Sequence, residues 1–91
     1  MNVSTIAITI LEALDDLDNT DEIKADTFGL TQDDFEYIIE LMNVGGLVLG
    51  VREKVDPSGN YSIYMENRPE ITLRGAKYLY EMKALKLALK Q

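Results

Sequence analysis

An amphipathic helix is predicted at the start of the chain, over about residues 3–17. Its apolar positions recur at helical spacing: Val3, Ile6, Ala7, Ile10, Leu14 and Leu17. A strand pattern competes locally, because Ile6, Ile8 and Ile10 alternate with Ala7 and Thr9. The helical spacing continues through Leu14 and Leu17, beyond the usual length of a strand, and therefore favours the helix.

Two further helices are predicted before the middle of the chain. Asn19 and Thr20 are N-cap residues that introduce a short helix over residues 21–26, and Gly29 ends it. Thr31 caps a third helix over about residues 32–43, with Asp34 in a near capping box. Two glycines at 45 and 46 stop that helix. Its buried face is predicted to be Phe35, Ile38, Ile39 and Met42, packed against Ile6, Ile10, Leu14, Leu47 and Leu49.

A β-hairpin is predicted over residues 47–65. Residues 47–53 are rich in apolar and β-branched side chains, and residues 61–65 alternate between two faces. Between them, residues 56–60 combine aspartate, proline, serine, glycine and asparagine, which is strong turn chemistry. Pro69 is expected to break the chain after the hairpin, and Thr72 to cap a last helix over residues 73–90.

The last helix carries two apolar stripes on nearly opposite faces. We expect one stripe to meet the protein's own core: Leu73, Ala76, Tyr80, Ala84 and Leu87. The other would leave a contiguous apolar strip in water: Tyr78, Met82, Leu85 and Leu89. These four residues are therefore the candidate interface of a homodimer. The alternative is that the helix folds back and buries both stripes within one domain.

This order of elements predicts an α+β fold of the winged helix-turn-helix type. Three N-terminal helices precede a hairpin, which is the wing, and a long C-terminal helix follows it. The length of 91 residues and the hydrophobic share of 46% fit one folded domain over residues 1–91.

Two segments, GLTQDDFEYIIELMNVGGLVLGV and ITLRGAKYL, carry a resemblance to a known family. With the elements in this order, the chain resembles the YjcQ family of small bacterial and phage-associated proteins, over about residues 5–80. The resemblance implies a winged helix of phage or prophage origin. It transfers no catalytic residue, because the family has no established biochemical activity.

The composition argues against an enzyme and against a bound cofactor or metal. The chain has no cysteine and no histidine, which removes the thiol nucleophile, the commonest general base and the commonest metal ligand. The acidic run from Asp15 to Glu22 does not match a calcium loop, because glycine and glutamate are missing at the required positions. No phosphate-binding glycine motif occurs. No apolar run reaches membrane-spanning length and no secretory signal is apparent, so we expect a cytoplasmic protein that does not bind membranes.

Charge divides the chain into an acidic front half and a mildly basic back half. Residues 1–50 carry a net charge of −10 and residues 51–91 carry +3, for a total of −7. The predicted third helix would expose Gln32, Asp33, Glu36, Tyr37 and Glu40, which opposes insertion into a DNA groove. A small regulator that binds protein is therefore the first hypothesis. The alternative is a transcriptional regulator that contacts DNA through Arg52, Lys54, Asn60, Tyr61, Arg68, Arg74 and Lys77.

Overall fold

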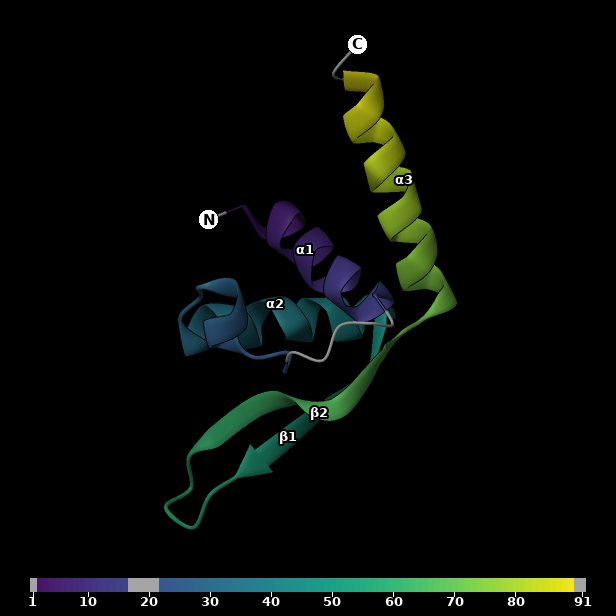
Figure 1. The fold of residues 1–91 in the computed structure, drawn as a ribbon. Helices are drawn as coiled ribbons and strands as arrows, with labels where there is room; N and C mark the ends of the chain where they lie inside the picture. Colours follow the sequence, from purple (N-terminus) through teal and green to yellow (C-terminus); the bar gives the residue numbers. More distant parts are fainter. Residues whose placement is uncertain (1, 17–21, 90–91) are drawn as a thin grey trace.

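The structure, a computed structural model, describes residues 2–16 and 22–89, with the backbone alone at residues 67 and 68. In chain order the elements are helix α1 (Val3–Asp15), the 3₁₀ helix η1 (Ala25–Phe28), helix α2 (Gln32–Val44), strands β1 (Val48–Val55) and β2 (Tyr61–Ile71), and helix α3 (Leu73–Leu89). The two strands form one antiparallel hairpin. The fold is therefore α+β, as the sequence predicts (Figure 1).

Helix α2 lies at the centre of the arrangement. It packs against α1 on one side and against both strands on the other, while α3 packs against α1 (Figure 1). The hairpin and the C-terminal half of α3 extend away from this centre in opposite directions. The described part of the chain consequently has a long axis of 53 Å and a width of about half that length, 26 Å.

The predicted core of α2 is confirmed. Phe35, Ile38, Ile39 and Met42 are all buried, and Ile10 of α1 is fully buried against them. The prediction for Leu49 is wrong, because β1 begins with Val48 turned inward and the next side chain is 56% exposed. Leu11, which the predicted stripe omits, is fully buried, so the inner face of α1 is wider than expected. Leu17 lies outside the described residues.

Side-chain caps fix the beginnings of the three α-helices. The Thr31 hydroxyl accepts a hydrogen bond from the Asp34 N–H at 3.1 Å, as predicted. The Thr72 hydroxyl accepts one from the Gly75 N–H at 2.9 Å. Asn2 caps α1 in the same manner, which the sequence pattern did not single out. Each cap satisfies a backbone donor that the first helical turn leaves free.

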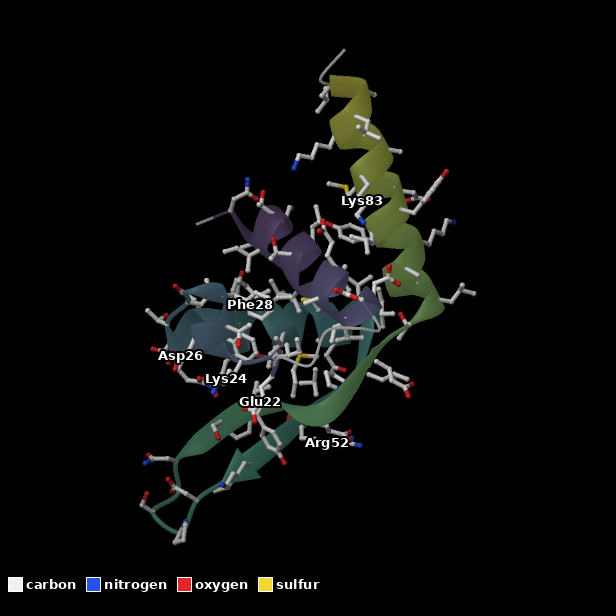
Figure 2. All side chains as sticks on the ribbon, viewed as in Figure 1. Glu22, Lys24, Asp26, Phe28, Arg52 and Lys83 are labelled. Carbon is white, nitrogen blue, oxygen red and sulfur yellow. The ribbon has the colours of Figure 1, made fainter. Side chains whose placement is uncertain are left out.

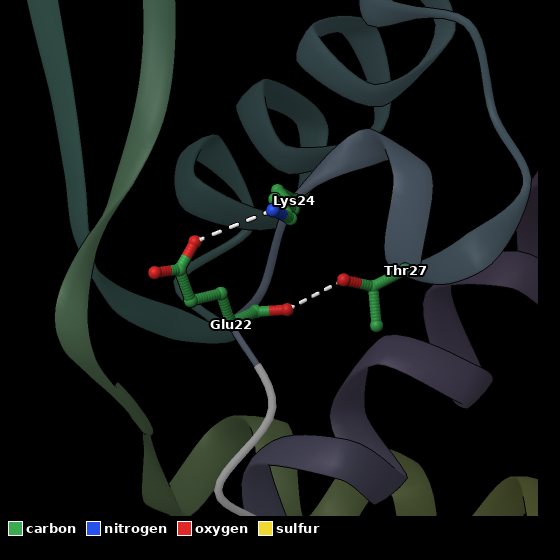
Figure 3. Close-up of polar contacts among 3 residues, drawn as sticks. All are labelled: Glu22, Lys24 and Thr27. Carbon is green, nitrogen blue, oxygen red and sulfur yellow. Dashed lines mark hydrogen bonds and ion pairs between the residues drawn. The ribbon is translucent and has the colours of Figure 1, made fainter.

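The short helix predicted over residues 21–26 is wrong in position and type. The structure has a single 3₁₀ turn at Ala25–Phe28, which ends at Gly29 with a left-handed φ of 67°. The Thr27 hydroxyl donates to the Glu22 carbonyl at 2.6 Å and so closes the preceding residues into a turn (Figure 3). Burial of the Ala25 side chain holds the segment on the core. The predicted caps, Asn19 and Thr20, lie outside the described residues.

Pro69 does not break the chain, contrary to expectation, because β2 continues through it to Ile71. The pairing changes register there: Leu49 lies opposite Glu70, whereas Val51 lies opposite Met65. The extra residues of β2 bulge past Gly50, and a bulge tolerates a proline that lacks an N–H group. Gly50 has a φ of 98°, and a Cβ at this position would lie 3.1 Å from the Pro69 Cα.

The predicted core stripe of α3 is also wrong. Leu73 and Tyr80 are 89% and 75% exposed, and the buried residues of the helix are Gly75 and Leu79. Tyr78 of the other stripe is half-buried against the protein's own core. The inward face of α3 therefore begins at a glycine, a residue that contributes nothing to a hydrophobic pattern.

A compact junction joins the two helices to the two strands. Helix α2 ends in a Schellman motif in which Gly46 has a φ of 72° and the Leu47 N–H donates to the Met42 carbonyl at 2.9 Å. The Thr72 N–H then donates to the Leu47 carbonyl at 3.0 Å, and the Thr72 hydroxyl donates to the Gly46 carbonyl at 2.6 Å. A Cβ on Gly75 would clash with that same Leu47 carbonyl.

The junction predicts that Gly75→Ala destabilises the protein. Helix propensity alone would make alanine about 1 kcal/mol more stable than glycine inside a helix. The clash with the Leu47 backbone reverses this sign, and we expect a loss of about 1–3 kcal/mol in the free energy of unfolding. Urea denaturation measures it, with Ala84→Gly at an exposed position of α3 as the control for propensity. A more stable Gly75→Ala variant would contradict the close approach of α3 to β1.

Candidate functional site

An acidic surface lies where α2 faces the hairpin. Asp33, Tyr37 and Glu40 are exposed on α2, and Tyr61 is exposed on β2. Together with Glu36 and Ile63 they line a shallow pocket of about 270 Å³. The two tyrosine side chains are each 55% exposed. We refer to Asp33, Glu36, Tyr37, Glu40 and Tyr61 as the acidic surface.

Glu36 attaches α2 to the hairpin. Its Oε1 accepts a hydrogen bond from the Ile63 N–H at 2.6 Å, and the contact is partly buried. The sequence pattern placed Glu36 among the solvated residues of α2 and so missed this role. The two partners are 27 residues apart in the sequence, and no local sequence signal marks a contact over that separation.

The acidic surroundings also act on Tyr61. A hydrogen bond with the Glu53 side chain is the largest cause that raises the pKa of the Tyr61 hydroxyl. Desolvation and the negative charges of Glu53, Glu40 and Glu36 act in the same direction. Tyr61 therefore remains a neutral hydrogen-bonding group at physiological pH, surrounded by negative charge.

Three of the candidate DNA-binding cations have partners within the described part of the chain. Arg52 of β1 pairs with Glu66 at 2.6 Å, and Lys77 of α3 pairs with Glu81 at 3.9 Å. Arg74 Nη1 donates to the Gly45 carbonyl at 3.4 Å, in the junction. Arg52 and Lys77 are thus paired with glutamates, and Arg74 is bonded to a backbone carbonyl.

The remaining candidates lie on the hairpin. Lys54 is exposed on β1. Asn60 belongs to the turn, where its side-chain amide donates to the Ser58 hydroxyl at 3.1 Å and its N–H donates to the Asp56 carboxylate at 2.9 Å. A hydrogen bond from the Ser58 hydroxyl is the largest cause that lowers the pKa of the Asp56 carboxyl, and the bond from the Asn60 N–H acts in the same direction. The Arg68 side chain lies outside the described part of the structure.

A groove separates α1 from the C-terminal half of α3. Its apolar lining consists of Ile8 from α1 with Met82, Leu85 and Leu89 from α3, and its volume is about 460 Å³. Leu85 and Leu89 are 51% and 78% exposed. Figure 2 shows Lys83 on the side of α3 that faces α1, and this residue lines the groove with Lys86 and Glu12. Three of the four predicted interface residues thus share one groove, whereas Tyr78 packs inward.

The position of Ile8 explains the strand-like alternation of apolar residues near the N-terminus. Ile10 is fully buried, Ile6 and Ile8 are partly buried against the core, and Ile8 also lines the groove. The alternation therefore marked a helix with apolar residues on two sides. The sequence contained this signal, although the predicted stripe left Ile8 out.

The described residues contain no group of three or more acidic side chains arranged to hold a metal ion. None of the helices in the described ranges is long and apolar enough to cross a membrane.

Comparison with known proteins identifies the family. No curated protein and no solved structure matches the chain. The family model described as YjcQ protein matches residues 6–91, which covers nearly the whole chain and both segments that carry the resemblance. The chain therefore belongs to the YjcQ family.

Proposed function

We propose that this chain is a small, non-enzymatic winged helix-turn-helix protein that binds another protein, and that it acts as a dimer. The order of α1, η1, α2, hairpin and α3 supports the winged-helix assignment, with α2 as the recognition helix and the hairpin as the wing. The proposal includes the phage or prophage origin that the family resemblance implies.

The acidic surface is the observation that carries the proposal. DNA affinity depends largely on the neutralisation of phosphates, and base readout relies heavily on arginine, lysine, asparagine and glutamine. The exposed face of α2 instead presents Asp33 and Glu40, and Glu36 connects it to the hairpin. A helix with this face would repel a phosphate backbone.

A basic protein surface fits the same residues. The carboxylates of Asp33 and Glu40 can pair with lysine or arginine of a partner. The exposed rings of Tyr37 and Tyr61 can stack on a guanidinium group, which is an arrangement worth about 0.5–2 kcal/mol. Tyrosine is also enriched at protein interfaces, where its ring buries a large area at a small cost in conformational entropy.

DNA binding through the hairpin and α3 is the second candidate function. Its support is the use of winged helices as DNA-binding folds, together with the exposed Lys54 and Lys77. The ion pairs of Arg52 and Lys77 with glutamates weigh against it, because each pair cancels a charge that a phosphate would need.

The dimer is supported by the shape of α3. The helix extends beyond α1 (Figure 1), so that Leu85, Leu87 and Leu89 remain largely exposed in a single chain. An apolar groove of this kind on a small protein is typical of an interface. Lys83 and Lys86 at its rim can face acidic residues of a second copy, although exposed ion pairs add little energy.

Charge reversal on α2 separates protein binding from DNA binding. We expect wild-type protein to retain a host protein in a pull-down and to give no mobility shift with genomic DNA at low salt. Asp33→Lys with Glu40→Lys should lose the protein and gain a salt-sensitive DNA shift, because two repulsive charges become attractive. Both residues are exposed, so the fold should be unaffected.

Asp26→Lys is the control, since this acidic residue is exposed on η1 and does not line the pocket of the acidic surface. It should change neither result. A DNA shift by wild-type protein that Lys54→Glu with Arg74→Glu abolishes would overturn the proposal in favour of DNA binding.

The groove predicts the behaviour of two leucine variants. Sedimentation equilibrium should give twice the chain mass of 10.3 kDa for wild-type protein. Leu85→Glu with Leu89→Glu should give a folded monomer, because both side chains line the groove and neither belongs to the core. Leu87→Glu changes an equally exposed leucine that does not line the groove, and it should retain the dimer. A wild-type monomer at tens of micromolar would contradict the dimer.

A further inference from the structure

The hydrogen bonds of the hairpin reveal which backbone groups point away from it. In antiparallel strands, two opposed residues either bond to each other or both direct their N–H and C=O groups outward. Ile63 donates its N–H to Glu36, so it points away from β1, and Glu53 is the residue opposite it. The backbone of Glu53 consequently points away from β2, toward the outer edge of β1.

A hydrogen bond in the turn independently shows which residues of β1 point inward and which point outward. The Asp56 N–H donates to the Asn60 carbonyl at 2.9 Å, so this position points inward. Because the direction alternates along a strand, the odd-numbered residues of β1 point outward: Val51, Glu53 and Val55. Two separate contacts thus agree on the backbone groups that occupy the outer edge.

Among the described residues the outer edge of β1 is open, whereas Glu36 occupies the outer edge of β2 at Ile63. Within the described residues, β1 has β2 as its one neighbour in the sheet, and no backbone bond joins residues 51, 53 or 55 to a third segment. The equivalent groups of β2 lie beside α2, where Glu36 satisfies the Ile63 N–H. We refer to the outward backbone groups of Val51–Val55 as the open edge.

Side chains give the open edge a basic face and an apolar face. Arg52 and Lys54 project from one face of the hairpin and are exposed. The opposite face carries Val51 and Val55 beside Glu53, on the side where Ile63 and Met65 of β2 are buried. Val55 is 65% exposed, so the apolar face continues from the core to the open edge.

A second copy of β1 is a poor occupant of this edge. When two copies of β1 pair antiparallel along their outer edges, the bonded residues of both strands are odd-numbered. The pairing is therefore symmetric about a single residue, which lies opposite itself in the other copy. Centring on Glu53 places two glutamates together and sets Arg52 against Lys54, while centring on Arg52 or Lys54 places identical cations together. Like charges directly opposite each other destabilise a strand pair. The charges therefore disfavour self-pairing in the registers centred on residues 52–54.

We propose that the open edge binds an extended segment of a partner protein in which acidic and apolar residues alternate. The segment would add a third strand beside β1, with its main-chain groups bonded to Val51, Glu53 and Val55. Its carboxylates would face Arg52 and Lys54, and its apolar side chains would lie along Val51 and Val55. Lys54 makes no ion pair within the described residues and is the cation most available to the segment.

This binding site is separate from the acidic surface and goes beyond the proposed function. The acidic surface selects basic groups through side chains of α2, whereas the open edge selects an acidic strand through backbone bonds. The charge-reversed α2 variant should therefore bind the strand as wild-type protein does, and failure of either proposal leaves the other intact.

A short peptide of alternating glutamate and valine tests the proposal. Titrated into isotope-labelled protein, it should shift the amide resonances of Val51, Glu53 and Val55 and slow their hydrogen exchange. Lys54→Glu should weaken binding about five- to tenfold, because one opposite-charge pair becomes a like-charge pair. A peptide that places lysine opposite residue 54 and keeps glutamate opposite Arg52 should restore the affinity for that variant, which a loss of folding would not allow.

An N-methylated version of the glutamate–valine peptide is the matched control. It keeps the charge and the apolar side chains but lacks the donors that strand pairing needs, and it should not bind. Equal binding of the methylated peptide, absence of binding at millimolar concentration, or shifts confined to α2 or α3 would each overturn the proposal.

Discussion

The Leu47 carbonyl and its neighbours control the arrangement of the whole chain. At this junction α2 ends, β1 begins, β2 ends and α3 begins, within a few residues of each other in space. Thr72 donates its N–H to Leu47 and its hydroxyl to Gly46, and the same hydroxyl caps α3. Gly75 permits α3 to pass against that carbonyl, where any side chain would clash. One threonine and one glycine thus fix the directions of the hairpin and the last helix.

The surfaces of the protein follow from those directions. Because α3 leaves the junction beside α1 and extends past it, a groove opens between Ile8 and Leu85. Because the hairpin leaves in the other direction beneath α2, Glu36 reaches the Ile63 N–H and occupies the outer edge of β2 at that residue. The other edge, on β1, remains open. The acidic surface, the groove and the open edge are therefore three consequences of one junction.

Local signals were sufficient to predict α2 and much of the core. The Thr31 cap, the apolar spacing from Phe35 to Met42 and the glycines that end the helix all act within a few residues, and the structure confirms each of them. The failures involve distant partners. Continuation of β2 through Pro69 depends on Gly50, and the inward face of α3 depends on the close approach of Gly75 to Leu47. Glycine carries no hydrophobic signal, so periodicity could not find these contacts.

The central claim is that Glu36 connects the exposed face of α2 to the hairpin and leaves β1 as the open edge. Amide hydrogen exchange of single residues tests it most directly. Ile63 should exchange slowly in wild-type protein and rapidly in Glu36→Ala, with Glu40→Ala unchanged, because Glu36 is the acceptor of the Ile63 N–H. Glu53, opposite it on β1, should exchange rapidly in all three proteins. Rapid exchange of Ile63 in wild-type protein, or protection of Glu53, would contradict the account.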